Sequence, residues 1–81
     1  MTDQIDAIVT MANLMYCKNY RQAIDGTRQN NKSINLDKLI DDILYVCRFA
    51  LMMHDIQGFI LFNPTNNNFY FRTYEPTNQH N

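Results

Sequence analysis

The sequence has few of the residues from which catalytic and metal-binding sites are usually built. Its 81 residues include two histidines and two cysteines. Nucleophilic catalysis requires a nucleophile and a base within hydrogen-bond reach, but Cys47 and His54 are separated by about 10.5 Å along a helix. Together with Cys17 and Asp55 they also lack the ligand spacing of a zinc site, such as CxxC or HxxxH. We therefore expect no catalytic activity, no metal and no cofactor.

Charged residues are also scarce, at 19% of the chain, and the formal net charge is −1. A non-specific nucleic-acid-binding protein normally carries a clear basic excess, which is missing here. No apolar run approaches the roughly 20 residues that span a membrane, and the N-terminus lacks the basic start of a secretory signal. We therefore expect a cytoplasmic protein without membrane contact, in which Cys17 and Cys47 are buried thiols.

Apolar residues recur at three- and four-residue steps from about residue 3 to residue 25, which predicts an amphipathic helix. Thr2 or Asp3 can cap its start, and Gly26 can take the left-handed conformation that ends a helix. The opposite face, which includes Asn13 and Lys18, is expected to be solvated. The apolar stripe consists of Ile5, Ile8, Val9, Ala12, Met15, Tyr16, Tyr20, Ala23 and Ile24.

A second helix is predicted over residues 36–54, after a polar connector at residues 27–32. Asn35 is its predicted N-cap, and Gly58 is expected to stop it. Apolar residues cover most of its circumference, which is typical of a central, buried helix. We expect the first helix to cover one side of it, and the hairpin or a second subunit to cover another.

Two aromatic-rich segments, residues 59–62 and 69–74, flank a cluster of proline and asparagine and therefore predict a β-hairpin. In the second strand Phe69, Phe71 and Thr73 share the face that we expect to contact the core. Residues 1–76 are predicted to form a single α+β domain, and residues 77–81 a flexible C-terminal tail.

The predicted fold class is α+β, with two antiparallel amphipathic helices followed by a C-terminal β-hairpin, completed by homodimerisation. A two-stranded hairpin is marginal alone, and the second helix carries surplus apolar surface. A twofold dimer, the commonest symmetric assembly, would bury both, either by joining the hairpins into one sheet or by packing the second helices together. The alternative is a monomer in which the two helices and the hairpin cover each other's apolar surfaces completely. The predicted dimer interface consists of Leu39, Val46, Phe49, Met53 and Phe62.

The other face of the second strand carries Tyr70, Arg72 and Tyr74. Because tyrosine and arginine are enriched in interaction hot spots, we predict a non-enzymatic protein-interaction module with these residues in its binding site. Interleaved aromatic and arginine side chains also stack single-stranded bases, so nucleic-acid binding is the alternative. The abundance of asparagine, isoleucine, tyrosine and phenylalanine hints at an AT-rich coding sequence, and hence at a viral, phage or mobile-element accessory protein that binds a host or structural protein.

Overall fold

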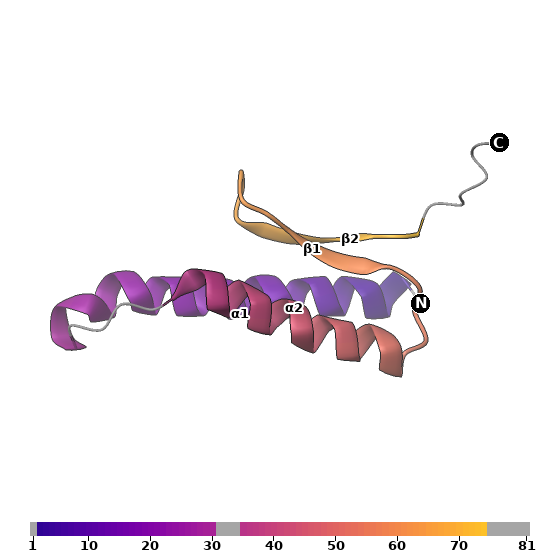
Figure 1. The fold of residues 1–81 in the computed structure, drawn as a ribbon, viewed down its shortest axis with the longest axis horizontal. Helices are drawn as coiled ribbons and strands as arrows, with labels where there is room; N and C mark the ends of the chain where they lie inside the picture. Colours follow the sequence, from indigo (N-terminus) through magenta and orange to yellow (C-terminus); the bar gives the residue numbers. More distant parts are fainter. Residues whose placement is uncertain (1, 31–34, 75–81) are drawn as a thin grey trace.

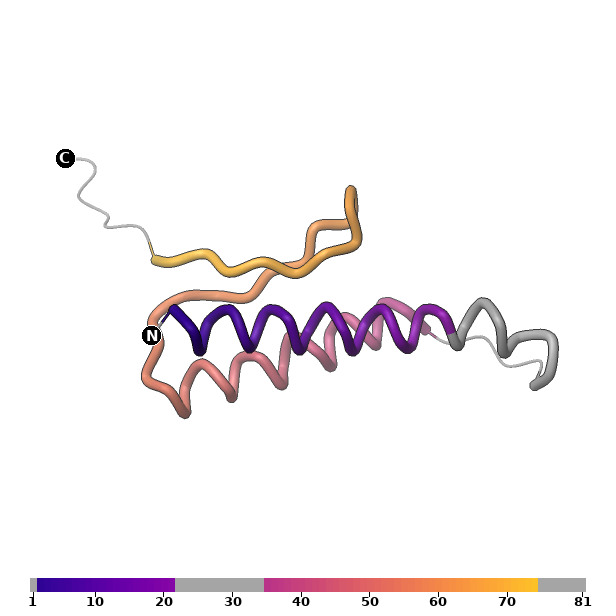
Figure 2. Tube along the Cα trace, turned by 180° about the vertical axis from the view of Figure 1, so that it is seen from behind, coloured from indigo at the N-terminus to yellow at the C-terminus, as the bar shows by residue number. Residues whose placement is uncertain are grey.

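The computed structural model describes residues 2–30 and 35–74, with the side chains of residues 2–21 and 35–74. Its elements are α1 (Thr2–Asn30), α2 (Leu36–Met53), β1 (Phe59–Asn63) and β2 (Asn68–Arg72). The two helices lie side by side, and the hairpin lies over one face of the pair (Figures 1 and 2). β1 contacts α2, and β2 contacts α1. The predicted α+β arrangement is therefore confirmed, while the predicted tail at residues 77–81 lies outside the described residues.

α1 is longer than the sequence pattern predicted, because it continues through Gly26 to Asn30. The prediction that Gly26 ends the helix is therefore wrong, as is the start of a connector at Thr27. Glycine weakens a helix by about 1 kcal/mol relative to alanine, but it permits the left-handed conformation without requiring it. The rest of the predicted connector, residues 31–34, lies outside the described part of the chain.

α2 begins as predicted and ends one residue before the predicted end at residue 54. The Asn35 side chain accepts a hydrogen bond from the backbone N–H of Lys38 at 3.1 Å, which is the expected N-cap. His54 is the C-cap, and Asp55 follows it in the left-handed region with φ 56°. The helix therefore ends before Gly58, and the prediction that Gly58 stops it is wrong.

Gly58 instead leads the chain into β1. Its φ is +150°, which side chains rarely adopt, and an added Cβ would lie 2.8 Å from the carbonyl oxygen of Arg72 and closer still to the ring of Phe71. Glycine is therefore required here by both the backbone conformation and the close approach of β2.

The core lies where the two helices meet the hairpin. Ile43 and Cys47 of α2 are fully buried at its centre. The Tyr16 ring of α1 packs against two rings of the hairpin, with centroids 5.2 Å from Phe62 and 6.0 Å from Phe69. These ring contacts join α1 to both strands of the hairpin. The buried core residues are Ile8, Ala12, Tyr16, Ile43, Cys47, Leu51, Ile56, Ile60 and Phe69.

Two predictions for α1 are wrong in detail. Asn13, expected on the solvated face, is partly buried and bonds to β2. Cys17, expected to be buried, is exposed. The exposure of Cys17 follows from the direction of the stripe: Tyr16 points into the core, and the next residue is turned by about 100° around a helix of 3.6 residues per turn. The predicted burial of Cys47 is confirmed.

Candidate protein-interaction surfaces

The hairpin has one face on the helices and one face away from them. Residues directly opposite each other in an antiparallel pair share a face. The helix-facing pairs are Ile60–Phe71 and Phe62–Phe69, and the outward-facing pairs are Phe59–Arg72 and Leu61–Tyr70. Burial agrees with this division, since Phe69 is only 2% exposed, whereas Tyr70 is 41% exposed.

We call the second side the outer hairpin face; it consists of Phe59, Leu61, Tyr70, Arg72 and Tyr74. The rings of Phe59 and Tyr74 are in edge-to-face contact, with centroids 4.6 Å apart. The three predicted binding residues of this face, Tyr70, Arg72 and Tyr74, are all exposed. Thr73, which was expected on the core face, is exposed as well, because it follows the last residue of β2 and no longer packs on α1.

The two edges of the hairpin differ in what covers them. On the β2 edge, the side chain of Asn13 accepts a hydrogen bond from the backbone N–H of Phe69 at 2.6 Å and donates one to its carbonyl oxygen at 3.4 Å. Both backbone groups of Phe69 therefore point away from β1. Because the bonding direction alternates along an antiparallel strand, the backbone groups of Ile60 and Phe62 point away from β2, toward the free edge of β1.

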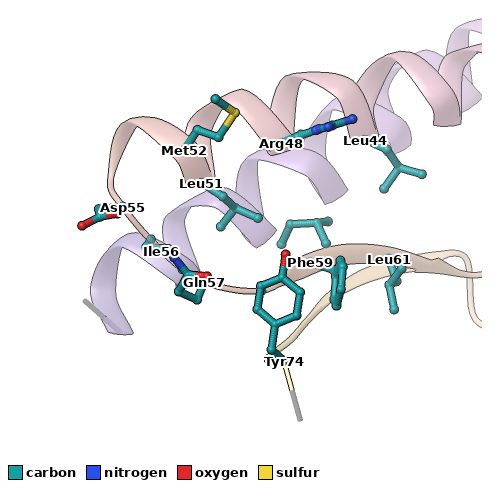
Figure 3. Close-up of a pocket in the computed structure, with 12 residues that line it drawn as sticks. Leu44, Arg48, Leu51, Met52, Asp55, Ile56, Gln57, Phe59, Leu61 and Tyr74 are labelled. Atoms are coloured by element: carbon teal, nitrogen blue, oxygen red, sulfur yellow. The ribbon is translucent and has the colours of Figure 1, made fainter. Parts of the chain in front are cut away.

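A groove of about 660 Å³ lies between α2 and β1 (Figure 3). Leu44, Arg48 and Met52 form its α2 wall, and Phe59 and Leu61 belong to its β1 wall. The groove therefore follows the same edge of β1 that has no strand beside it in the described part of the chain. Its lining is mixed: the Arg48 guanidinium lies on one wall and the Tyr74 ring near Phe59 on the other, and Asp55 and Gln57 add further polar groups.

The side of α2 that faces away from the core is also apolar. We call it the α2 outer face; it consists of Tyr45, Val46, Phe49, Met52 and Met53. Their exposed fractions range from 43% for Val46 to 83% for Met53. The rings of Tyr45 and Phe49 pack edge to face with centroids 5.0 Å apart. Clustered exposed apolar side chains of this kind are typical of interaction sites.

The residues predicted for a dimer interface separate into two groups. Val46, Phe49 and Met53 lie on the α2 outer face and are exposed. Leu39 and Phe62 are partly buried against the core of their own chain. A helical pattern gives the angle between side chains, but it does not say which flank the neighbouring elements occupy.

The groups with catalytic potential are dispersed. His54 is exposed at the end of α2, Cys17 is exposed on α1, and Cys47 is enclosed in the core. Burial raises the pKa of the Cys47 thiol above its usual value. Burial, followed by the proximity of Tyr20 and Asp37, also raises the pKa of Tyr16. Within residues 2–30 and 35–74, no three His, Cys, Asp or Glu side chains are grouped as metal ligands would be.

No family model, curated protein or solved structure matches this chain. Among the described residues, neither helix has the length and apolar character that would let it cross a membrane.

Proposed function

We propose that this chain is a non-enzymatic protein-interaction module that binds another protein through the outer hairpin face. The observation that carries the proposal is the exposure of an aromatic, arginine-containing surface on a sheet whose other face is packed on helices. The uncovered face of such an antiparallel sheet is usually polar. Here Phe59, Tyr70 and Tyr74 are 41–55% exposed, and Arg72 lies between them.

The chemistry of this face favours a protein partner. Tyrosine and arginine combine a large contact area with hydrogen-bonding groups, and they are enriched in interaction hot spots. Among the described residues of this face Arg72 is the only cation, whereas a nucleic-acid-binding groove normally follows the phosphate backbone with several. The predicted setting, a cytoplasmic accessory protein of a virus, phage or mobile element, rests on composition alone.

Affinity capture with the full-length chain, from an extract of the cells that naturally produce it, tests the proposal. We expect one protein to be retained by the unchanged chain and lost with Tyr70→Ala and with Arg72→Ala. Arg21→Ala and Leu14→Ala are matched controls, because both residues are exposed on α1. These two variants should capture the same protein as the unchanged chain.

Two results contradict the proposal. One is capture that is equally strong in all four variants, which would place the binding surface elsewhere. The other is retardation of single-stranded RNA or DNA that weakens with salt and is lost with Arg72→Ala, since phosphate contacts release counterions. That second result would identify the outer hairpin face as a base-stacking surface.

A further inference from the structure

The free edge of β1 carries backbone hydrogen-bonding groups without a partner strand in the described part of the chain, and it lies beside the groove. Ile60 and Phe62 direct their N–H and C=O groups to this edge, as the bonds between Asn13 and Phe69 establish. No hydrogen bond to these groups is present among the described residues. An exposed strand edge of this kind is a template for another strand.

We infer that this edge and the adjoining Arg48 side of α2 together bind a second copy of the chain, in a twofold dimer with Leu61 on the axis. Antiparallel pairing of β1 with itself places Ile60 of each copy opposite Phe62 of the other. Each of these two pairs can then exchange two backbone hydrogen bonds. The inference does not depend on the proposed partner of the outer hairpin face.

The same symmetry places the two α2 helices beside each other, because β1 lies over α2. Leu44 and Leu61 both line the groove, so the axis passes α2 near Leu44. Asp41 and Arg48 lie about one turn to either side of Leu44 and, being seven residues apart, on the same side of the helix. In antiparallel helices Arg48 of one copy therefore lies near Asp41 of the other.

Charge complementarity supports this arrangement. Asp41 and Arg48 are both exposed, and within the described part of the chain the single ion pair is the one between Lys38 and Asp42. The symmetric contact gives both charges a partner of opposite sign. A net charge of −1 also leaves little repulsion between copies.

The Arg48 side of α2 also offers apolar surface beside the β1 edge. Tyr45 and Met52 are 60% and 65% exposed, and both lie within about 60° of Arg48 around the helix. The antiparallel contact of the two helices therefore buries apolar surface from both copies next to the paired strands.

Light scattering and disulfide trapping test the inference together. We expect the full chain to have twice the mass of a single 9.6 kDa copy. In a Cys17→Ser background, Leu61→Cys places two thiols across the axis, where the Cα atoms of such a pair are about 4.5 Å apart, within disulfide range. Mild oxidation should therefore give a covalent dimer that reducing agent reverses.

The matched control is Tyr70→Cys in the same background. Tyr70 lies directly opposite Leu61 on the same outer face, but in the joined sheet its two copies would be three strand spacings, or about 14 Å, apart. This variant should not cross-link. A monomeric mass at 100 µM protein would overturn the inference, as would a dimer in which Tyr70→Cys cross-links as readily as Leu61→Cys.

A charge exchange provides a second measurement that does not depend on cysteine chemistry. Arg48→Asp should raise the dimer dissociation constant at least 10-fold. Arg48→Asp combined with Asp41→Arg should restore most of the lost affinity. Circular dichroism confirms that each variant is folded. If the single change leaves the dissociation constant unaltered, the proposed α2 contact is refuted. Mass and cross-linking test the dimer, whereas capture that depends on Arg72 tests the proposed protein partner. The failure of one proposal can therefore be distinguished from the failure of the other.

Discussion

Replacing Asn13 should destabilise the protein far more than its position on a largely polar helix face suggests. Its amide bonds both backbone groups of Phe69, a residue that is only 2% exposed. In Asn13→Ala these two groups lose their partner in a place that water reaches poorly. An unsatisfied buried group costs about 1–3 kcal/mol. Since the bond to the carbonyl is long, at 3.4 Å, we expect a total loss of about 2 kcal/mol.

Asn19→Ala is the matched control. Asn19 lies on the same helix, is also partly buried, and donates its side-chain hydrogen bond to the Met15 carbonyl one turn earlier. That carbonyl keeps its place in the helical hydrogen-bond ladder, so we expect a change within about 0.5 kcal/mol. Both substitutions gain the same helix propensity. The difference between the two variants therefore isolates the link to β2.

Urea unfolding followed by circular dichroism, at fixed protein concentration, measures the effect. A loss of 2 kcal/mol is a large part of the roughly 4–12 kcal/mol expected for a domain of this length. With a slope near 1–1.5 kcal/mol/M, the midpoint should fall by about 1.5 M. Asn13→Leu, which restores side-chain volume without hydrogen bonds, should be no more stable than Asn13→Ala. If Asn13→Ala and Asn19→Ala unfold at the same urea concentration, the assigned role of Asn13 is refuted.

Three further predictions concern Gly58 and the cysteines. Gly58→Ala should lower the unfolding free energy by at least about 2 kcal/mol, because its Cβ would overlap β2 in a strained conformation; an unchanged urea midpoint would contradict this. In the native protein a thiol reagent should modify Cys17 within minutes and Cys47 only at the rate of unfolding; equal rates would show that Cys47 is accessible. Because burial raises the Cys47 pKa in the folded state, stability should be constant below about pH 8.5 and should fall above it, where only the unfolded thiol ionises. Urea titrations from pH 7 to 9.5 check this, and Cys47→Ala should remove the decline.

The features that were predictable from the sequence are those whose cause is local. Asn35 is an N-cap because its own side chain reaches the N–H three residues later. The hairpin follows from two aromatic segments around an asparagine-rich turn, in which Asn63 and Asn66 accept backbone N–H groups two residues ahead. The exposure of Tyr70, Arg72 and Tyr74 follows from the two-residue period of a strand, with Tyr74 just beyond its end.

The features that were missed depend on contacts between distant residues. Asn13 bonds to a backbone group 56 positions away, and its residue type alone favours the solvated side of a helix. The packing of Phe62 and Leu39 against the core of their own chain could not be predicted either, because an apolar residue at their positions fits the core as well as a second copy. The end of α1 was missed for a different reason: one glycine is a weak signal against the cooperative continuation of a helix.

The unequal edges of the hairpin limit how far copies of the chain can assemble through their strands. A sheet with two open edges can extend without end, as amyloid does. Here the Asn13 amide is hydrogen-bonded to the backbone of Phe69 on the β2 edge. An incoming strand would first have to displace this amide. In the part of the chain that the structure describes, β1 therefore has the more available edge, and pairing two β1 edges uses both. The partly buried Asn13 amide thus disfavours extension at the β2 edge, which favours a closed pair over a filament.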